Sequence, residues 1–198
     1  MSERTQRGSK TGELPEHPPP VGAVVPVRTP EPGTLLTTGA ERDLAITHWL
    51  LGAAPDLRQS RWEWVQDSQT FLRCGALFTA VRIPGVMVRA AAGTQDPGVV
   101  DRVLVEALSG GPVIATYGLS LYYALVPSTT ARRWQELSAE CLANRTLLAV
   151  PPVGRNTYDG DAYWAAPMEG PAERYVPETV KRFVRYALLR WQDSEILR

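Results

Sequence analysis

The chain has few of the residues that build disulfide scaffolds, zinc sites and histidine-based catalytic centres. Its 198 residues include two cysteines, Cys74 and Cys141, and two histidines, His17 and His48. Two cysteines are too few for a disulfide scaffold, and no CxxC pair or His/Cys cluster has zinc spacing. Histidine is the usual general base near neutral pH, so that kind of catalysis has little support. We therefore expect no structural metal and interpret both cysteines as core thiols.

Long apolar runs and an excess of one charge are also missing. No apolar run approaches the roughly 20 residues that a membrane helix needs, and the polar start MSERTQRGSK lacks the apolar segment of a secretory signal. Basic and acidic residues balance at 21 each, which argues against a dedicated duplex-binding protein but leaves room for a local basic groove. These absences predict a cytoplasmic protein without a membrane partner, and they leave the oligomeric state open.

The standard catalytic and phosphate-binding motifs are absent as well. The sequence contains no GxxxxGK[ST] loop, no GxGxxG after a strand, no HExxH and no GxSxG. An enzyme is therefore not the favoured expectation.

The first 33 residues differ in composition from the rest of the chain. They hold seven of the 17 prolines, including Pro18, Pro19 and Pro20, mixed with charged and small residues. Such a segment buries too little apolar surface to offset its ordering entropy, so we predict a disordered tail over residues 1–33. A polyproline segment that docks in an aromatic groove is the less favoured alternative. Residues 34–198 are expected to form a single α+β domain.

Hydrophobic periodicity and capping residues predict the helices. They are expected over residues 38–52, 86–92, 97–109 and 130–137 and from Pro177 onward. Strands are expected over residues 76–83, 113–116 and 119–126, in RTLLAV before Pro151, and in DAYWAA before Pro167. For residues 53–69 we favour an edge strand with Trp62, Trp64 and Gln66 on one face, although the composition also permits a helix.

Hairpins interleaved with helices favour an α+β fold with a mainly antiparallel sheet. The helices are expected to cover one face of that sheet. We expect RTLLAV and DAYWAA to be neighbouring strands, because a polar loop that contains GRNTYDG separates them.

Three groups of side chains are candidates for chemistry. Asp159 and Asp161 have the alternate spacing that could hold Mg²⁺ or Mn²⁺, but a simple turn is the favoured interpretation and no cofactor is predicted. The last helix carries Lys181, Arg182 and Arg185, which could contact phosphates or an acidic partner, although a solvated face is more common. Aromatic residues in the predicted strands could stack on bases or simply pack in the sheet; these are Tyr122, Tyr123, Tyr163 and Trp164.

One family shows a related pattern. The string LYYALVP, followed by ECLANRTLLAVPPVGRNTYDGDAYW, resembles the closing section of the bifunctional DNA primase/polymerase N-terminal domain of the archaeo-eukaryotic primase superfamily. The match covers about residues 112–164 and is anchored on two proline-ended strands. The chain also resembles small actinobacterial proteins that carry a similar AVRIP, GGPV, YYALVP and CL pattern.

The chain departs from this family at the metal-binding positions. The family's first motif supplies two aspartates for divalent metals, and the corresponding strand FTAVRIP contains none. The histidine of the second motif falls on Leu121, and only the acid of the third motif has a counterpart, Glu140. Two-metal nucleotidyl transfer needs several convergent carboxylates. The resemblance therefore implies a degenerate, non-catalytic module that binds nucleotide, nucleic acid or a protein partner.

The resemblance also implies which residues would line the cleft. These are Tyr122, Tyr123, Glu140, Arg145 and Arg155. The alternative hypothesis is a regulatory protein whose tail and basic last helix dock a protein partner, with the sheet as a scaffold. A third hypothesis, less favoured than both, is an enzyme that uses Asp159 and Asp161 with a divalent ion.

Overall fold

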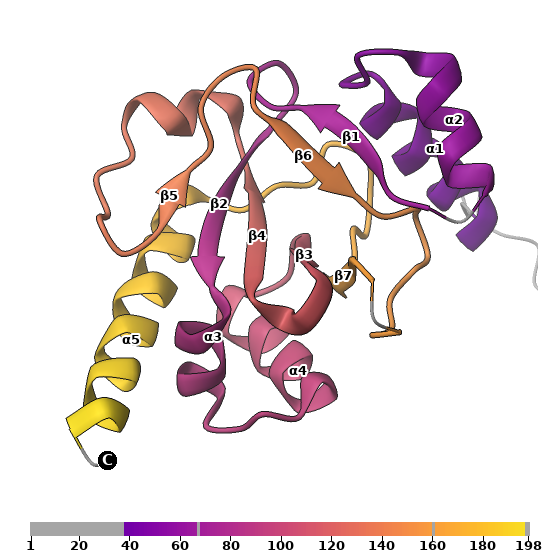
Figure 1. Cartoon of the computed structure of the whole chain (residues 1–198). Coiled ribbons are helices and arrows are strands. Elements are labelled where there is room, and N and C mark those ends of the chain that lie inside the picture. The colour runs from indigo at the N-terminus through magenta and orange to yellow at the C-terminus, as the bar shows by residue number, and fades with distance from the viewer. Residues whose placement is uncertain (1–37, 67, 160, 197–198) are drawn as a thin grey trace, which may run out of the picture. The chain divides into compact units, whose positions relative to one another are not determined.

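Five antiparallel strands form the central sheet of the computed structural model, which describes residues 38–66, 68–159 and 161–196 (Figure 1). The strand order is β5-β2-β4-β3-β7. Two further strands, β1 and β6, pair only with each other and form an antiparallel ribbon. The strands are β1 (Thr70–Arg73), β2 (Thr79–Pro84), β3 (Val113–Ala115), β4 (Leu121–Val126), β5 (Glu140–Cys141), β6 (Leu147–Val150) and β7 (Tyr163–Ala166).

Two of the helices, α1 and α4, begin at capping residues that the sequence indicates. The α-helices are α1 (Gly39–Leu51), α2 (Leu57–Val65), α3 (Gly85–Ala92), α4 (Pro97–Leu108) and α5 (Pro177–Ile196). The Thr38 hydroxyl accepts from the Glu41 N–H, and the Glu41 carboxylate accepts from the Thr38 N–H, which makes a capping box. The Asp96 carboxylate accepts from the Val99 N–H at the start of α4. Together with the antiparallel sheet, these helices confirm the α+β fold.

The predicted tail over residues 1–33 lies outside the described residues. All described residues fall within one unit, Thr37–Arg198. A single domain over residues 34–198 stays a prediction. In the part of the chain that the structure describes, no helix combines the length and the apolar character needed to cross a membrane.

The prediction of an edge strand over residues 53–69 is wrong. This segment contains α2, which begins after Asp56, whose carboxylate accepts from the N–H groups of Arg58 and Gln59. Trp62 is 59% exposed, whereas the Trp64 indole N–H donates to the Val150 carbonyl over 3.1 Å. The two tryptophans therefore point in different directions, as residues two apart on a helix do.

The predicted helix over residues 130–137 is also displaced. The structure instead has a short 3₁₀ helix over Ser128–Arg132. It ends before Trp134, whose indole N–H donates to the carbonyl of Ala139 further along the chain over 2.7 Å. A second 3₁₀ turn, Tyr117–Leu119, joins β3 to β4, so the predicted hairpin is confirmed.

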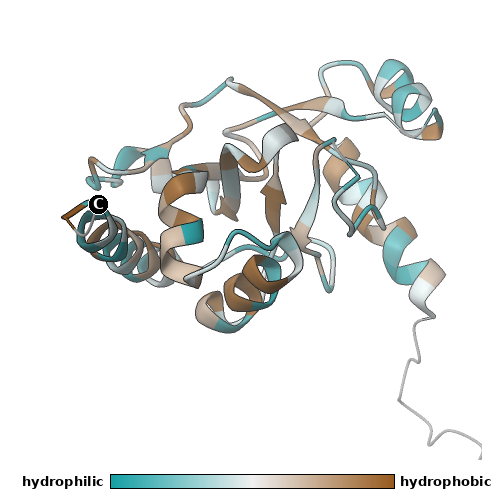
Figure 2. Cartoon of the chain, turned by 60° about the horizontal axis from the view of Figure 1, so that its bottom comes forward, coloured by the Kyte–Doolittle hydropathy of each residue, from teal (hydrophilic) through white to brown (hydrophobic). Residues whose placement is uncertain are grey.

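Other elements pack on both faces of the central sheet, and the expectation that helices cover one face only is wrong. On the helix face, α3, α4 and α5 pack on residues that include Val81, Tyr122 and Tyr163. On the ribbon face, α1 and the β1–β6 ribbon pack on residues that include Leu125 and Trp164. Figure 2 shows hydrophobic residues along the strands and alternating hydropathy along the helices. The second cover is needed because successive residues of β4, LYYALV, are apolar toward both faces.

The prediction that RTLLAV and DAYWAA are adjacent strands is wrong. Strand β6 pairs with β1, where Thr70 faces Val150, and β7 pairs with β3 at the edge of the central sheet. The segment that connects β6 to β7 is hydrogen-bonded to β7 instead. Its Pro152 carbonyl accepts from the Trp164 indole over 3.2 Å, and its Arg155 carbonyl accepts from the Trp164 backbone N–H over 2.8 Å.

Candidate functional site

One row of side chains crosses the ribbon face of the central sheet. In the ladder register Glu140 faces Arg82, Arg82 faces Tyr123, Tyr123 faces Ile114 and Ile114 faces Trp164. Directly opposed residues in antiparallel strands share a face, and neighbouring strands lie about 4.8 Å apart. The row therefore places side chains from all five strands next to one another.

The row is exposed at one end and buried at the other. The side chain of Arg82 is 44% exposed and that of Glu140 is 57% exposed, and the two form an ion pair. Tyr123 is half-buried, whereas Ile114 and Trp164 are at most 2% exposed. We call Glu140, Arg82 and Tyr123 the exposed row. Burial raises the pKa of the Tyr123 hydroxyl, so the phenol is neutral at physiological pH.

The positions that the resemblance in the sequence assigns to the three motifs lie on or next to this row. Arg82 lies on β2, the strand that corresponds to the first motif, and Glu140 lies beside it on β5. Leu121, which stands at the histidine position, lies two residues before Tyr123 on β4 and so points to the same face. Arg82 is the charged residue of β2 in this row.

Two of the five predicted ligand residues, Tyr123 and Glu140, are thus brought together. Tyr122 is not, because alternation along β4 turns it to the helix face, where it is fully buried. Burial raises the pKa of Tyr122 to about 12, and its hydroxyl has no hydrogen-bond partner among the described residues.

The two predicted arginines are not part of the exposed row and lie in the loops on either side of β6. Arg145 is exposed in the turn before β6 and its N–H donates to the Cys74 carbonyl over 2.9 Å. Arg155 lies in the connection that leads to β7, and its side chain is only 11% exposed. Its Nε lies 3.8 Å from a carboxylate oxygen of Asp159.

The two predicted metal ligands show the geometry of a turn. The Asp159 carboxylate accepts from the Asp161 N–H over 3.2 Å. Within the described ranges, no three His, Cys, Asp or Glu side chains gather in a way that could hold a metal ion.

The basic face of the last helix is largely paired. The Arg185 guanidinium donates to the Glu136 carboxylate, with a shortest distance of 2.6 Å. Lys181 donates to Glu178 over 2.8 Å and lies over the Trp134 ring, with its Nζ 6.0 Å from the ring centroid. Phosphates or an acidic partner would have to compete with these contacts.

The thiols are not activated. Cys74 is buried and Cys141 is half-buried. Burial raises the pKa of both, in Cys141 to about 11, so each is a neutral thiol at physiological pH.

Two polar groups in the structure have little or no signal in the sequence. Arg82 is one; the polar break in the apolar run FTAVRI was the only signal for it. The other is Asp101 on α4, whose two carboxylate oxygens each lie 3.0 Å from the Tyr163 hydroxyl. Burial raises the pKa of Asp101 to about 6. No motif marks this pair, because its members lie 62 residues apart.

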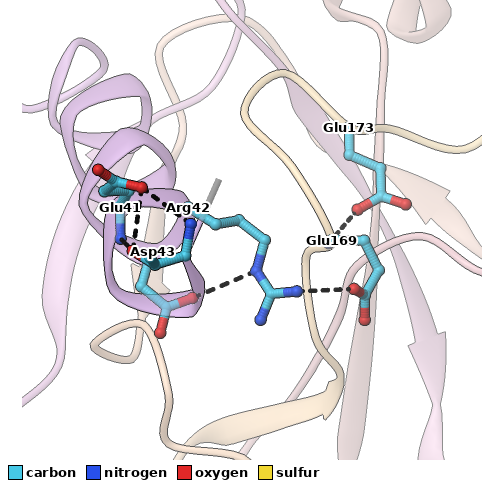
Figure 3. A network of polar contacts seen from close by, with 6 residues as sticks. Glu41, Arg42, Asp43, Glu169 and Glu173 are labelled. Carbon is cyan, nitrogen blue, oxygen red and sulfur yellow. Dashed lines mark hydrogen bonds and ion pairs between the residues drawn. The ribbon is translucent and has the colours of Figure 1, made fainter. Parts of the chain in front are cut away.

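Two concave regions lie outside the exposed row. The larger, about 750 Å³, lies between α3 and α5 and is lined by residues that include Arg89 and Trp191. The smaller, about 210 Å³, lies beside Trp164. Arg42 stands at its edge between Asp43 and Glu169, with Nη1 3.3 Å from the Glu169 carboxylate (Figure 3). Its guanidinium is thus already paired.

Comparison with models of protein families, with curated proteins and with solved structures gave no match.

Proposed function

We propose that this chain is a non-catalytic, primase/polymerase-like module that binds single-stranded nucleic acid on the exposed row. The observation that carries the proposal is the placement of an exposed guanidinium, Arg82, directly beside the ring of Tyr123 on a sheet. Aromatic side chains on a sheet stack with unpaired bases, and arginines contact phosphates.

The surroundings of the exposed row favour an extended ligand over a small molecule. Neither concave region described above is lined by Arg82, Tyr123 or Glu140, whose side chains occupy one row of a sheet. A single strand can follow such a row with one base on Tyr123 and its phosphate on Arg82. Specific small-molecule sites are usually concave.

The ion pair between Arg82 and Glu140 explains why the proposal excludes two-metal catalysis. Two-metal transfer requires several carboxylates around both ions, and Glu140 is the one acid of the exposed row. Its negative charge is already matched by Arg82. In this proposal the Arg82 guanidinium contacts the phosphate, and binding needs no divalent ion.

The test is fluorescence anisotropy with a labelled oligothymidylate of about 20 nucleotides, in EDTA and about 50 mM salt. The variants are Arg82→Ala and Tyr123→Leu, and the control is Arg102→Ala, which removes an exposed arginine on α4. Stacking on one aromatic residue contributes about 1–3 kcal/mol, so we expect Tyr123→Leu to weaken binding at least several-fold. Undetectable binding, or equal affinity for all four proteins, would overturn the proposal.

A protein partner is the second candidate function, and one observation favours it. Trp62 is 59% exposed and Val65 is 78% exposed, and residues three apart lie on the same side of α2. Exposed tryptophan is typical of the centre of protein interfaces. If this surface binds a partner, Trp62→Ser should abolish the cross-links that form in cell extract and leave oligothymidylate binding unchanged. Loss of oligothymidylate binding in this variant would argue against a separate protein interface.

A further inference from the structure

The outer side of the β1–β6 ribbon exposes apolar side chains. Leu72 and Leu148 point inward and are at most 3% exposed. Alternation along the strands turns Phe71 and Leu147 outward, and these are 50% and 51% exposed. Phe71 faces Ala149 and Arg73 faces Leu147, so the phenyl ring, the guanidinium and the leucine are neighbours.

A second arginine lies at the same end of the ribbon. The N–H of Arg145 donates to the carbonyl of Cys74, the residue after Arg73. Arg145 has a φ of 72°, in the left-handed region that disfavours residues with a side chain. Glycine at this position would therefore make the fold more stable than arginine does. The presence of an exposed arginine here indicates that its charge has a function.

The local charge favours a polyanion. Residues 68–75 and 141–150, which include both strands of the ribbon, contain no Asp or Glu and two arginines, Arg73 and Arg145. Within the described part of the chain, neither Arg73 nor Arg145 forms an ion pair. The Glu63 carboxylate accepts a hydrogen bond from the ribbon, but its partner is the Thr70 hydroxyl at the opposite end of β1 from Arg73. The chain is neutral overall, so these two arginines give this end of the ribbon a local positive charge.

The ribbon and the exposed row lie on the same side of the central sheet. Leu148 and Val150 of the ribbon belong to one apolar cluster with Ala80 and Leu125. Ala80 and Leu125 lie two residues from Arg82 and Tyr123 on the same strands. The ribbon therefore covers one part of this face and leaves the exposed row beside it.

We propose that the outer side of the ribbon, formed by Phe71, Arg73, Leu147 and Arg145, is a second contact for the single strand bound at the exposed row. Phe71 stacks with a base, and the two arginines contact phosphates. An exposed aromatic ring beside unpaired arginines fits nucleic acid better than an acidic peptide, which offers charge without bases. This inference rests on the proposed function.

The test compares oligothymidylates of about 5 and about 20 nucleotides, because only the longer one can reach both contacts. The variants are Phe71→Ala, Arg145→Gly and the double variant Arg73→Ala/Arg145→Gly, with Arg102→Ala as the control. Arg145→Gly relieves the strained φ, so loss of binding in this variant does not reflect unfolding. We expect the double variant to bind the longer strand about tenfold more weakly, with a salt slope smaller by about 2. Binding of the short strand should not change.

Four other results would contradict the second contact or assign the ribbon to another partner. Unchanged binding of the long strand in the ribbon variants would overturn the second contact and leave the exposed row in place. Absence of binding for both lengths would overturn the proposed function and this inference together. If polyglutamate displaces the long strand as well as unlabelled oligothymidylate does, and Phe71→Ala does not change binding, the ribbon would be assigned to acidic polypeptides. A change in sedimentation coefficient for Phe71→Ala would assign it to a second copy of the chain.

Discussion

The partly buried pair of Asp101 and Tyr163 makes stability depend on pH in a direction that the structure fixes. Asp101 carries a carboxylate whose pKa burial raises to about 6, whereas an aspartate in an unfolded chain has a pKa of about 4. The folded protein therefore binds this proton more tightly than the unfolded chain. The stability contributed by the protonated form is fully present below about pH 4 and is lost as the pH rises through about 6.

Replacing Asp101 with Asn removes the buried charge and keeps an oxygen that can accept from the Tyr163 hydroxyl. One pKa unit corresponds to about 1.4 kcal/mol, which sets an upper limit of about 3 kcal/mol for the gain at pH 7.5. Solvent screening at this partly exposed site lowers the expected gain to about 1–2 kcal/mol. The melting temperature should rise by about 2–8 °C at that pH.

The assay is urea unfolding followed by tryptophan fluorescence, at about pH 4 and pH 7.5. Asp161→Asn is the matched control, because Asp161 is an exposed aspartate. We expect Asp101→Asn to stabilise the protein at the higher pH and to leave it unchanged at the lower one. A variant that is destabilised at pH 7.5, or that shifts equally at both values, would refute the reasoning.

Two further substitutions test the fold. Thr38→Ala removes the capping box of α1 and should lower the free energy of unfolding by about 1 kcal/mol; an unchanged urea midpoint would show that α1 does not depend on this cap. Gly111 has a φ of 93°, and a Cβ there would lie 2.7 Å from the Tyr175 ring, so Gly111→Ala should destabilise the protein by more than about 2 kcal/mol. Wild-type thermal stability in this variant would show that the Tyr175 ring moves freely.

Local signals in the sequence identified most helices and the central hairpin. Asp96 and Pro97 fix the start of α4, and the Tyr117-Gly118 pair lies in the connection of β3 to β4. These elements are set by residues near them in the chain, so their sequence is enough. The α2 segment is ambiguous at this level, because nine residues carry too few buried positions to separate a helix from a strand.

Pairing between distant segments is what the sequence could not provide. Strand β6 joins β1, about 75 residues earlier, because Leu148 and Val150 share a buried surface with Leu72. For the same reason the sequence did not reveal Arg82, which lies between Glu140 and Tyr123 in the ladder register. The register across β5, β2 and β4 depends on packing, which periodicity alone does not encode.

The most direct test of the central claim is the affinity of Glu140→Gln for a labelled oligothymidylate in EDTA, compared with wild type. If the exposed row binds phosphate through Arg82 without a metal, removing the opposing carboxylate frees the guanidinium and should tighten binding several-fold. Weaker binding by Glu140→Gln, together with wild-type binding that requires Mg²⁺ or Mn²⁺, would contradict the account and assign Glu140 to a metal.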